Sequence, residues 1–178
     1  MIIVISGSVG SGKTFISDKF ALKFDFEVVH LNEIVTKFKL NDDLEAQTFD
    51  FDLDNFLKFI EREIKKAKKE NKNIIFESHF AHFINPDLVD ILFIINRDLK
   101  ELKKEYIKRK YNSNKIKDNL EVESFNLCFY EAIEEGYGEE VQGLKFNNNN
   151  NKINIFSIEN NKKVDLILED IIKIVKNN

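Results

Sequence analysis

Five short runs of hydrophobic residues recur along the chain, and segments with a helical period separate them. The runs cover residues 1–5, 26–31, 73–77, 91–95 and 153–158. Continuous apolarity over a short run is typical of a strand that is buried on both faces, and strands that alternate with helices form parallel sheets. The pattern therefore predicts an α/β fold, a three-layer α/β/α arrangement around a five-stranded parallel sheet.

The segments between these runs carry apolar residues three or four positions apart, which places them on one face of a helix. The series are Ile16, Phe20 and Phe24; Phe56, Ile60 and Ile64; Val122, Phe125, Phe129 and Ile133; and Val164, Ile167, Ile171 and Val175. Asp52 or Asp54 can cap the second major helix, and Asn71 can end it. Each helix thus has an apolar face that can cover the sheet.

Three segments depart from this alternation. Residues 41–50 are polar and acidic with scattered aromatics, and we expect a loop or a small helical excursion over the carboxyl ends of the strands. Residues 108–118 are basic and polar and lie between two helices. Because the ligand crevice of an open parallel sheet lies at the strand carboxyl ends, both segments could cover a phosphate ligand. Asn147–Asn151 is a homopolymeric patch, for which we expect a flexible loop.

The residues directly after the first apolar run match a phosphate-binding loop, or P-loop. Residues 7–14, GSVGSGKT, satisfy every fixed position of the pattern Gly-x-x-x-x-Gly-Lys-Ser/Thr between a predicted strand and a predicted helix. Glycines let backbone N–H groups surround an anion, and the helix N-terminus adds a positive dipole end. Lys13 would neutralise the β- and γ-phosphates of ATP, and the Thr14 hydroxyl can hold Mg²⁺. The predicted ATP-binding residues are Val9, Gly10, Ser11, Gly12, Lys13, Thr14 and Phe15.

Further candidates for chemistry follow the third apolar run, namely Glu77 and, two residues on, His79. A carboxylate at a strand end near the loop can hold Mg²⁺ or orient an attacking group, so Thr14 and Glu77 are the expected metal ligands. The His79 imidazole lies on the same side if the strand geometry continues. The alternative is a strand that ends in polar residues because it reaches solvent. His82 is a weaker candidate, and for His30 we favour a cap of the core edge over a place in the pocket.

Arginine is scarce, with three residues in the chain: Arg62, Arg97 and Arg109. Arg109 stands in the basic segment 108–118, where a guanidinium could hold transferring phosphate groups in a bidentate manner. The lysine-rich run over residues 65–72 is instead typical of the solvated face of an amphipathic helix. Arg109 is therefore the predicted phosphate clamp.

Length and composition narrow the class of protein. With 178 residues, the chain suffices for one domain with a sizeable core, so we expect residues 1–178 to form a single domain. The formal net charge of −4 argues against a general polyanion binder, and we expect no sequence-specific binding of nucleic acid. Cys128 is the only cysteine, and its apolar helical setting favours a buried structural thiol. No apolar stretch resembles a signal peptide or a membrane span, so we expect a cytoplasmic protein, or a nuclear one in a eukaryote.

Taken together, the loop, the Glu-x-His strand end and the segment from Arg109 onward resemble adenylate kinase isoenzyme six, a family also called coilin-interacting nuclear ATPase. This family lies within the P-loop nucleoside monophosphate kinases. The most specific part is residues 109–123, RKYNSNKIKDNLEVE, which is similar to the family's Arg-Gly-Tyr, Lys-Ile/Leu and Asp-Asn-x-x-x-Glu series. Glu131 and Ala132 fit as well, and the resemblance covers nearly the whole chain.

The resemblance implies a nucleoside monophosphate kinase fold, with a monophosphate-binding region at residues 30–53 and a lid at residues 108–118. It also implies two activities, the Mg²⁺-dependent transfer of the γ-phosphate of ATP to AMP and the hydrolysis of ATP. A link to small ribosomal subunit maturation, through binding of a small-subunit ribosomal protein, is implied as well. Glu77 falls at the Asp of the family's Asp-x-His motif, and His79 matches the His. The implied catalytic residues are Lys13, Glu77, His79 and Arg109, with Lys162, after the last strand, beside the adenine.

The chain departs from the family at positions where arginine is common. Thr36, Asn96 and Glu105 take three such places, and Lys110 replaces the glycine after Arg109. Phosphoryl transfer between two nucleotides depends on charge neutralisation, whereas hydrolysis needs fewer cationic groups. A second hypothesis is therefore a ribosome assembly ATPase whose nucleotide switches its binding to a ribosomal protein, with little kinase activity. A third and weaker one is a kinase for a small molecule other than a nucleotide.

Overall fold

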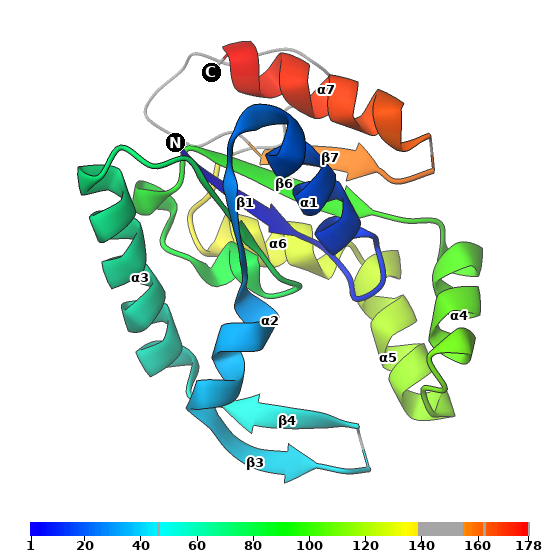
Figure 1. Cartoon of the computed structure of the whole chain (residues 1–178). Coiled ribbons are helices and arrows are strands. Elements are labelled where there is room, and N and C mark those ends of the chain that lie inside the picture. The colour runs from blue at the N-terminus through cyan, green and yellow to red at the C-terminus, as the bar shows by residue number, and fades with distance from the viewer. Residues whose placement is uncertain (46, 139–154, 162, 178) are drawn as a thin grey trace.

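The main sheet contains five parallel strands in the order β2-β5-β1-β6-β7 (Figure 1). This computed structural model describes residues 1–45, 47–138, 155–161 and 163–177. The strands are β1 (Ile2–Ser6), β2 (Glu27–His30), β5 (Ile74–Glu77), β6 (Ile91–Asn96) and β7 (Ile155–Glu159). Each strand coincides with one of the five apolar runs, so the predicted sheet is confirmed.

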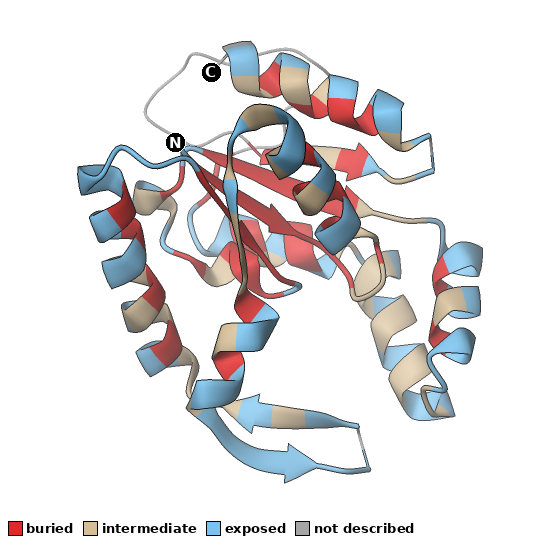
Figure 2. Ribbon diagram, in the orientation of Figure 1, coloured by how far each residue is buried: buried red, intermediate tan, exposed pale blue. Residues whose placement is uncertain are grey.

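Successive residues of the central strand β1 face opposite layers of the fold. Ile2 and Val4 join a core cluster with side chains of α3 (Leu53–Lys69) and α6 (Leu127–Glu134). Ile3 and Ile5 join a second cluster with side chains of α1 (Lys13–Phe24) and α7 (Val164–Asn177). Figure 2 shows buried residues throughout the central strands and along the inner faces of these helices. Helices on both faces of a parallel sheet give the predicted three-layer fold.

Shorter elements complete the fold, and most of them lie near the carboxyl edge of the sheet. They are α2 (Leu31–Ile34), α4 (Leu99–Lys108), α5 (Ser113–Ser124), the antiparallel strands β3 (Lys39–Asp43) and β4 (Thr48–Phe51), and the 3₁₀ helices η1 (Val35–Phe38), η2 (Ala81–Phe83) and η3 (Pro86–Leu88). None of the helices in the described part of the chain has both the length and the apolar composition that a membrane crossing requires.

Polar side chains fix where several helices begin and end. Of the two caps predicted for α3, Asp52 is used, because its Oδ1 accepts a hydrogen bond from the backbone N–H of Asn55 at 3.0 Å. Asn71, which follows the helix, has a φ of 53°, the left-handed conformation common at helix ends. Asp98 caps α4 and Asn112 caps α5 through their side chains.

The acidic segment at residues 41–50 is neither the loop nor the helical excursion that its composition predicted. Strands β3 and β4 form a hairpin there, outside the main sheet. On β4 the half-buried Phe49 and Phe51 alternate with Asp50, and the Phe51 ring lies 5.7 Å from that of Phe56 on α3. The residues of β3 are exposed, so a polar sequence is compatible with that strand.

The connection between the two helices in the basic segment 108–118 is shorter than predicted. Helix α4 ends at Lys108 and α5 begins at Ser113, so the link between the two helices comprises residues 109–112. Most of the predicted lid segment is therefore the first half of α5.

The apolar series from Val122 to Ile133 spans two helices where the spacing predicted one. The chain turns between α5 and α6 at Asn126, whose φ is 51°, and the Phe125 side chain just before it is 63% exposed. Two further predictions, the flexible loop at Asn147–Asn151 and the adenine contact of Lys162, lie outside the described residues.

Candidate active site

The phosphate-binding loop connects β1 to α1 at the carboxyl edge of the sheet. Gly7 has a φ of 131°, and a Cβ at this position would stand 2.2 Å from the carbonyl oxygen of Ile95 on β6. Only glycine allows the loop to pass so close to the neighbouring strand. The loop then enters α1 at Lys13, so its N–H groups and the positive end of the helix dipole meet at one point.

The Lys13 side chain lies folded over this loop. Its Nζ donates hydrogen bonds to the carbonyl oxygens of Gly7 and Ser8, both at 2.8 Å, and the residue is buried. Burial lowers the pKa of Lys13 to about 8, although the negative charge of Glu77 opposes the shift. An anionic phosphate would replace the two neutral carbonyl partners with a stronger one.

Donors from distant segments occupy the carbonyl oxygens of the next three loop residues. The Tyr106 hydroxyl donates to Val9 at 2.6 Å, Nη1 of Arg97 to Gly10 at 2.9 Å, and the Asn160 amide to Ser11 at 2.6 Å. An anion that enters the loop therefore meets N–H groups rather than competing carbonyl oxygens. Asn160 also brings the segment after β7 against the loop, close to where an adenine contact was predicted.

Glu77 lies at the centre of the site, buried at the end of β5. Its Oε2 accepts a hydrogen bond from the Thr14 hydroxyl at 3.2 Å and lies 3.0 Å from Nδ1 of His30. Nε2 of the same imidazole lies 3.3 Å from the carboxylate of Asp18. His30 therefore contacts the buried Glu77 carboxylate, a contact that our preference for a cap of the core edge did not anticipate. A hydroxyl beside a carboxylate supplies the oxygen ligands that a hard divalent cation such as Mg²⁺ prefers.

His79 lies beyond the end of β5, so the strand alternation that would have placed it with Glu77 does not continue to it. Its ring borders a cleft beside the loop. The surrounding protein atoms, and after them the positive charge of Lys13, lower the pKa of His79 to about 4. The imidazole is therefore neutral at pH 7, and it can accept or donate a single hydrogen bond in the cleft.

Arg109 borders the same cleft, where it ends α4. Its Nε donates a hydrogen bond to Oε1 of Glu105 at 2.8 Å, one helical turn earlier. The predicted clamp is therefore near the site but engaged by a carboxylate, which a phosphate ligand would have to replace.

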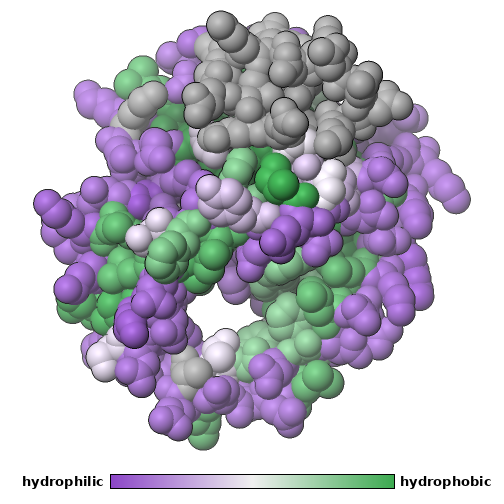
Figure 3. All heavy atoms as spheres, turned by 180° about the vertical axis from the view of Figure 1, so that it is seen from behind, coloured by the Kyte–Doolittle hydropathy of each residue, from purple (hydrophilic) through white to green (hydrophobic). Residues whose placement is uncertain are grey.

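The cleft has a volume of about 540 Å³, within the range of small-molecule sites. Its aromatic border includes Phe49 and Phe51 of the hairpin and Phe80, and its polar border includes Asn32 and Lys115. Seen from behind in Figure 3, the molecule has an opening through its lower part, with hydrophobic side chains along the border. The loop thus adjoins a second compartment with aromatic surfaces and the cationic side chains of Arg109 and Lys115.

Contacts between the hairpin tip and the start of α5 close the far side of this cleft. Asn112 donates from Nδ2 to the carbonyl oxygen of Glu45 at 2.7 Å and from its backbone N–H to Oε1 of Gln47 at 3.0 Å. Lys115 donates from Nζ to the carbonyl oxygen of Gln47. The predicted monophosphate-binding region and the predicted lid therefore touch across the cleft.

A family model matches most of the sequence. The model for AAA_18, described as an AAA domain, matches residues 3–126, which include the loop, the hairpin, Glu77 and all of α5. The chain belongs to the AAA_18 family. Among curated relatives of this AAA_18 domain, a "Putative adenylate kinase" of Methanosarcina acetivorans is 33% identical over 138 residues, which cover 75% of this chain and 72% of the relative. One of the same name from Pyrococcus furiosus is 30% identical over 135 residues, 76% of this chain and 70% of the relative.

Solved structures share the fold of the AAA_18 domain at low sequence identity. A deoxyadenosine kinase from M. mycoides aligns over 100% of both chains, with a TM-score of 0.54 and 18% identity. An unliganded sugar kinase from Janibacter sp. HTCC2649 covers 98% of this chain and 94% of that one, with a TM-score of 0.59 and 12% identity. The fold is thus similar to that of these two kinases.

Glu123 also belongs to the site of this AAA_18 domain, although it was not among the predicted site residues. One carboxylate oxygen accepts a hydrogen bond from the Ser8 hydroxyl of the loop at 2.5 Å, and the other accepts one from the backbone N–H of Arg97 at 2.6 Å. Burial raises the pKa of Glu123. The carboxylate ties α5 to the loop and to the end of β6, and its presence in the Asp-Asn-x-x-x-Glu series was the available sequence signal.

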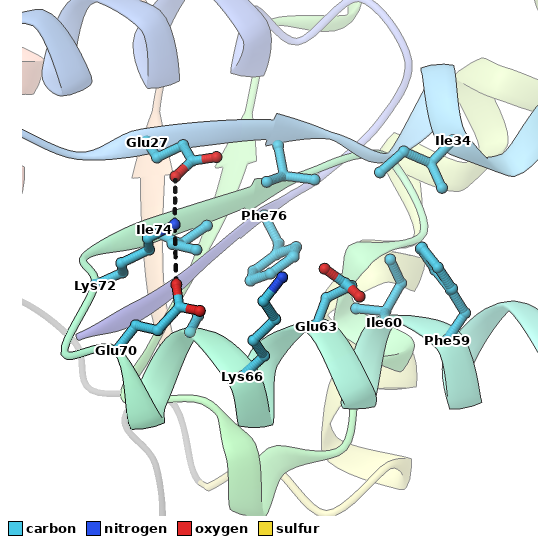
Figure 4. A pocket seen from close by; sticks show the side chains of 12 residues that line it. Glu27, Ile34, Phe59, Ile60, Glu63, Lys66, Glu70, Lys72, Ile74 and Phe76 are labelled. Carbon is cyan, nitrogen blue, oxygen red and sulfur yellow. Dashed lines mark ion pairs between the residues drawn. The ribbon is translucent and has the colours of Figure 1, made fainter.

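Two other places in the AAA_18 domain contribute less to the site. Phe15 is 53% exposed on the first turn of α1, so only its backbone is near the loop. A cavity of about 170 Å³ lies between α3 and the neighbouring strands β2 and β5 (Figure 4). Lys72 borders it and pairs with Glu70 at 3.1 Å and with Glu27 at 4.0 Å. The lining runs from Glu27 at the start of β2 to Ile34 on α2, and it includes no residue of the loop.

Proposed function

We propose that the protein is an adenylate kinase of the isoenzyme six type, which transfers the γ-phosphate of ATP to AMP with Mg²⁺ and also hydrolyses ATP. The observation that carries this proposal is the adjacency of two compartments, the phosphate-binding loop and the cleft of about 540 Å³ beside it. A phosphoryl transfer needs a donor site and an acceptor site that open onto each other. The names of the archaeal relatives support the same activity.

In this proposal the loop binds the triphosphate of ATP. Backbone N–H groups of residues 9–14 surround the β- and γ-phosphates, and Lys13 leaves the carbonyl oxygens of the loop to neutralise them. Thr14 and Glu77, whose side chains are 3.2 Å apart, would hold Mg²⁺, which neutralises phosphate charge when it is bound.

AMP would occupy the aromatic cleft. Phe49 or Phe51 offers a ring on which an adenine can stack, and the neutral His79 ring can orient the attacking phosphate or a water. Lys115 and Arg109 supply positive charge for the AMP phosphate, Arg109 after it leaves Glu105.

A second candidate function is the nucleotide-switched ribosome assembly ATPase with little kinase activity. The pairing of Arg109 with Glu105 favours it, because an engaged guanidinium is less available to transferring phosphate. The same resemblance motivates a small-subunit ribosomal protein as partner. A pull-down of such a protein with ATP, with ADP and without nucleotide tests the switch, and equal capture in all three states would remove it.

The test of the kinase proposal is a coupled assay that separates the two activities. ADP formed from ATP plus AMP is compared with phosphate released from ATP alone, for the wild type, Lys13→Ala and the control Lys19→Ala. Lys19 is exposed on α1, away from the loop carbonyl oxygens that Lys13 binds. We expect AMP-dependent formation of two ADP per AMP, lost in Lys13→Ala and kept in the control. If ATP releases phosphate at the same rate with and without AMP, and no additional ADP forms when AMP is present, the result would favour the ATPase.

A further inference from the structure

A cluster of three side chains that the proposed reaction does not use lies behind the active site. It consists of His82 on η2 and of Cys128 and Glu131, which are three residues apart on α6. One ligand atom from each, an imidazole nitrogen, a thiol sulfur and a carboxylate oxygen, lies within 4.8 Å of the other two. We propose that His82, Cys128 and Glu131 form a binding site for a zinc ion.

The imidazole of His82 is held in the orientation that a metal ligand needs. Its Nδ1 lies 2.7 Å from the hydroxyl oxygen of Ser6, and its Nε2 lies 2.9 Å from Oε2 of Glu131. Metal-binding histidines commonly use one ring nitrogen for the metal and the other for a hydrogen bond that fixes the ring. Ser6 supplies that second contact, which leaves Nε2 facing the carboxylate and the thiol.

The set of donor atoms selects zinc over magnesium. A nitrogen, a sulfur and a carboxylate oxygen are typical zinc ligands, at bond lengths of about 2.0–2.3 Å, whereas magnesium prefers oxygen ligands alone. Tetrahedral bonds of that length place donor atoms roughly 3.5 Å apart, so small side-chain rotations would bring these three atoms, which lie within 4.8 Å of one another, to that spacing. The fourth position is left for water.

Burial and access differ within the cluster in a way that suits a metal site. His82 and Cys128 are 1% and 5% exposed, whereas the Glu131 side chain is 41% exposed and provides a route for the ion. Zinc would bind the thiolate, so the Cys128 proton leaves to solvent, and the neutral His82 ring would keep its proton on Nδ1, beside the Ser6 hydroxyl, and bind through Nε2. Burial raises the pKa of the Cys128 thiol to about 12, so the thiol is protonated before an ion binds.

A bound ion would join η2 to α6 beside a residue of the active site. Sγ of Cys128 lies 3.9 Å from the carbonyl oxygen of His79, and the Ser6 hydroxyl lies 3.4 Å from the same oxygen. The zinc site would therefore stabilise the segment that presents the His79 ring to the cleft. A ligand that binds the folded state alone raises the melting temperature.

The experiment uses the full chain, stripped of metal with a chelator and dialysed into excess Mg²⁺. Zn²⁺ is titrated by calorimetry, and Co²⁺ serves as a spectroscopic probe of thiolate ligation. The variants are Glu131→Gln and Cys128→Ser, with Glu134→Gln as the matched control on the same helix and Glu77→Gln as the control for the active site. Circular dichroism checks that each variant is folded.

We expect one equivalent of Zn²⁺, a thiolate-to-cobalt charge-transfer band, and a higher melting temperature with zinc. Glu131→Gln should weaken binding by about 10- to 100-fold, and Cys128→Ser should abolish the band, whereas both control variants should keep the zinc affinity and the cobalt band of the wild type. Binding unchanged in Glu131→Gln, or a folded wild type that takes up no zinc in excess Mg²⁺, would overturn the proposal. Because Glu131 is half exposed, its variant gives a result even if Cys128→Ser fails to fold. No nucleotide is needed, so the outcome is independent of the proposed kinase activity.

Discussion

The contact between His30 and Glu77 predicts a loss of metal affinity when the imidazole is removed. Nδ1 of His30 lies 3.0 Å from the Glu77 carboxylate, which is buried and also accepts a hydrogen bond from Thr14. With the His30→Ala change, the carboxylate loses one of two partners and is free to turn away from the position beside Thr14. Glu77 would then be less well placed to hold Mg²⁺.

The size of the effect follows from the strength and exposure of this contact. A hydrogen bond to a charged group contributes about 1.5–3 kcal/mol. The His30 side chain is 26% exposed, so water can partly replace it, and the lower value applies. About 1.5 kcal/mol corresponds to roughly a tenfold rise in the Mg²⁺ concentration at half-maximal activity. Asp18 contacts the other nitrogen of the imidazole, and its side chain is 49% exposed. Asp18→Asn should therefore change the Mg²⁺ concentration at half-maximal activity by less than about threefold.

The assay is the initial rate of ADP formation against free Mg²⁺ at saturating ATP and AMP. The conservative variant His30→Asn retains a nitrogen donor near the position of Nδ1 and should restore most of the metal affinity. A Mg²⁺ dependence in His30→Ala equal to that of the wild type would refute the reasoning. An equal loss in His30→Asn would show that the ring acts through its bulk rather than through the hydrogen bond.

Three further predictions concern the loop and the cleft. Because the pKa of Lys13 is about 8 in the free protein, raising the pH from 7 to 9 should weaken ATP binding about tenfold, and calorimetry on Lys13→Met should show a flat profile. Gly7→Ala should lower the free energy of unfolding by about 3 kcal/mol or more, because the added Cβ would clash with backbone atoms. Gly10→Ala should lower it less, because the added Cβ there would contact side chains. Urea denaturation measures both values. Lys115→Met should raise the KM for AMP about tenfold with little change for ATP, whereas Lys117→Met, exposed on the same helix, should leave both unchanged.

The sheet could be predicted because its strands are buried on both faces. Every residue of β1 is buried, and such a run cannot be mistaken for a surface segment. The hairpin was missed because β3 is exposed along its whole length and Phe49 and Phe51 alone alternate on β4. Two residues are too few to establish a period of two.

The motif residues of the loop were predictable because the chemistry of phosphate binding acts on consecutive residues. Contacts between segments that lie far apart in the sequence could not be predicted. His30 reaches Glu77 because β2 pairs with β5 in a register that sets these two residues side by side. Glu123 reaches Ser8 because α5 crosses the end of the sheet. Neither the strand order nor the path of the helix can be read from local spacing, so the roles of both residues depended on the fold.

The measurement that tests the central claim most directly is equilibrium binding of ATP to the purified chain with excess Mg²⁺. Calorimetry should give one site in the wild type and a loss of at least about tenfold in affinity in Lys13→Met, whose side chain keeps its length but has no charge. The exposed Lys19→Met serves as the control and should bind as the wild type does. No ATP binding by the folded wild type, or equal binding by Lys13→Met, would contradict the assignment of the triphosphate to this loop.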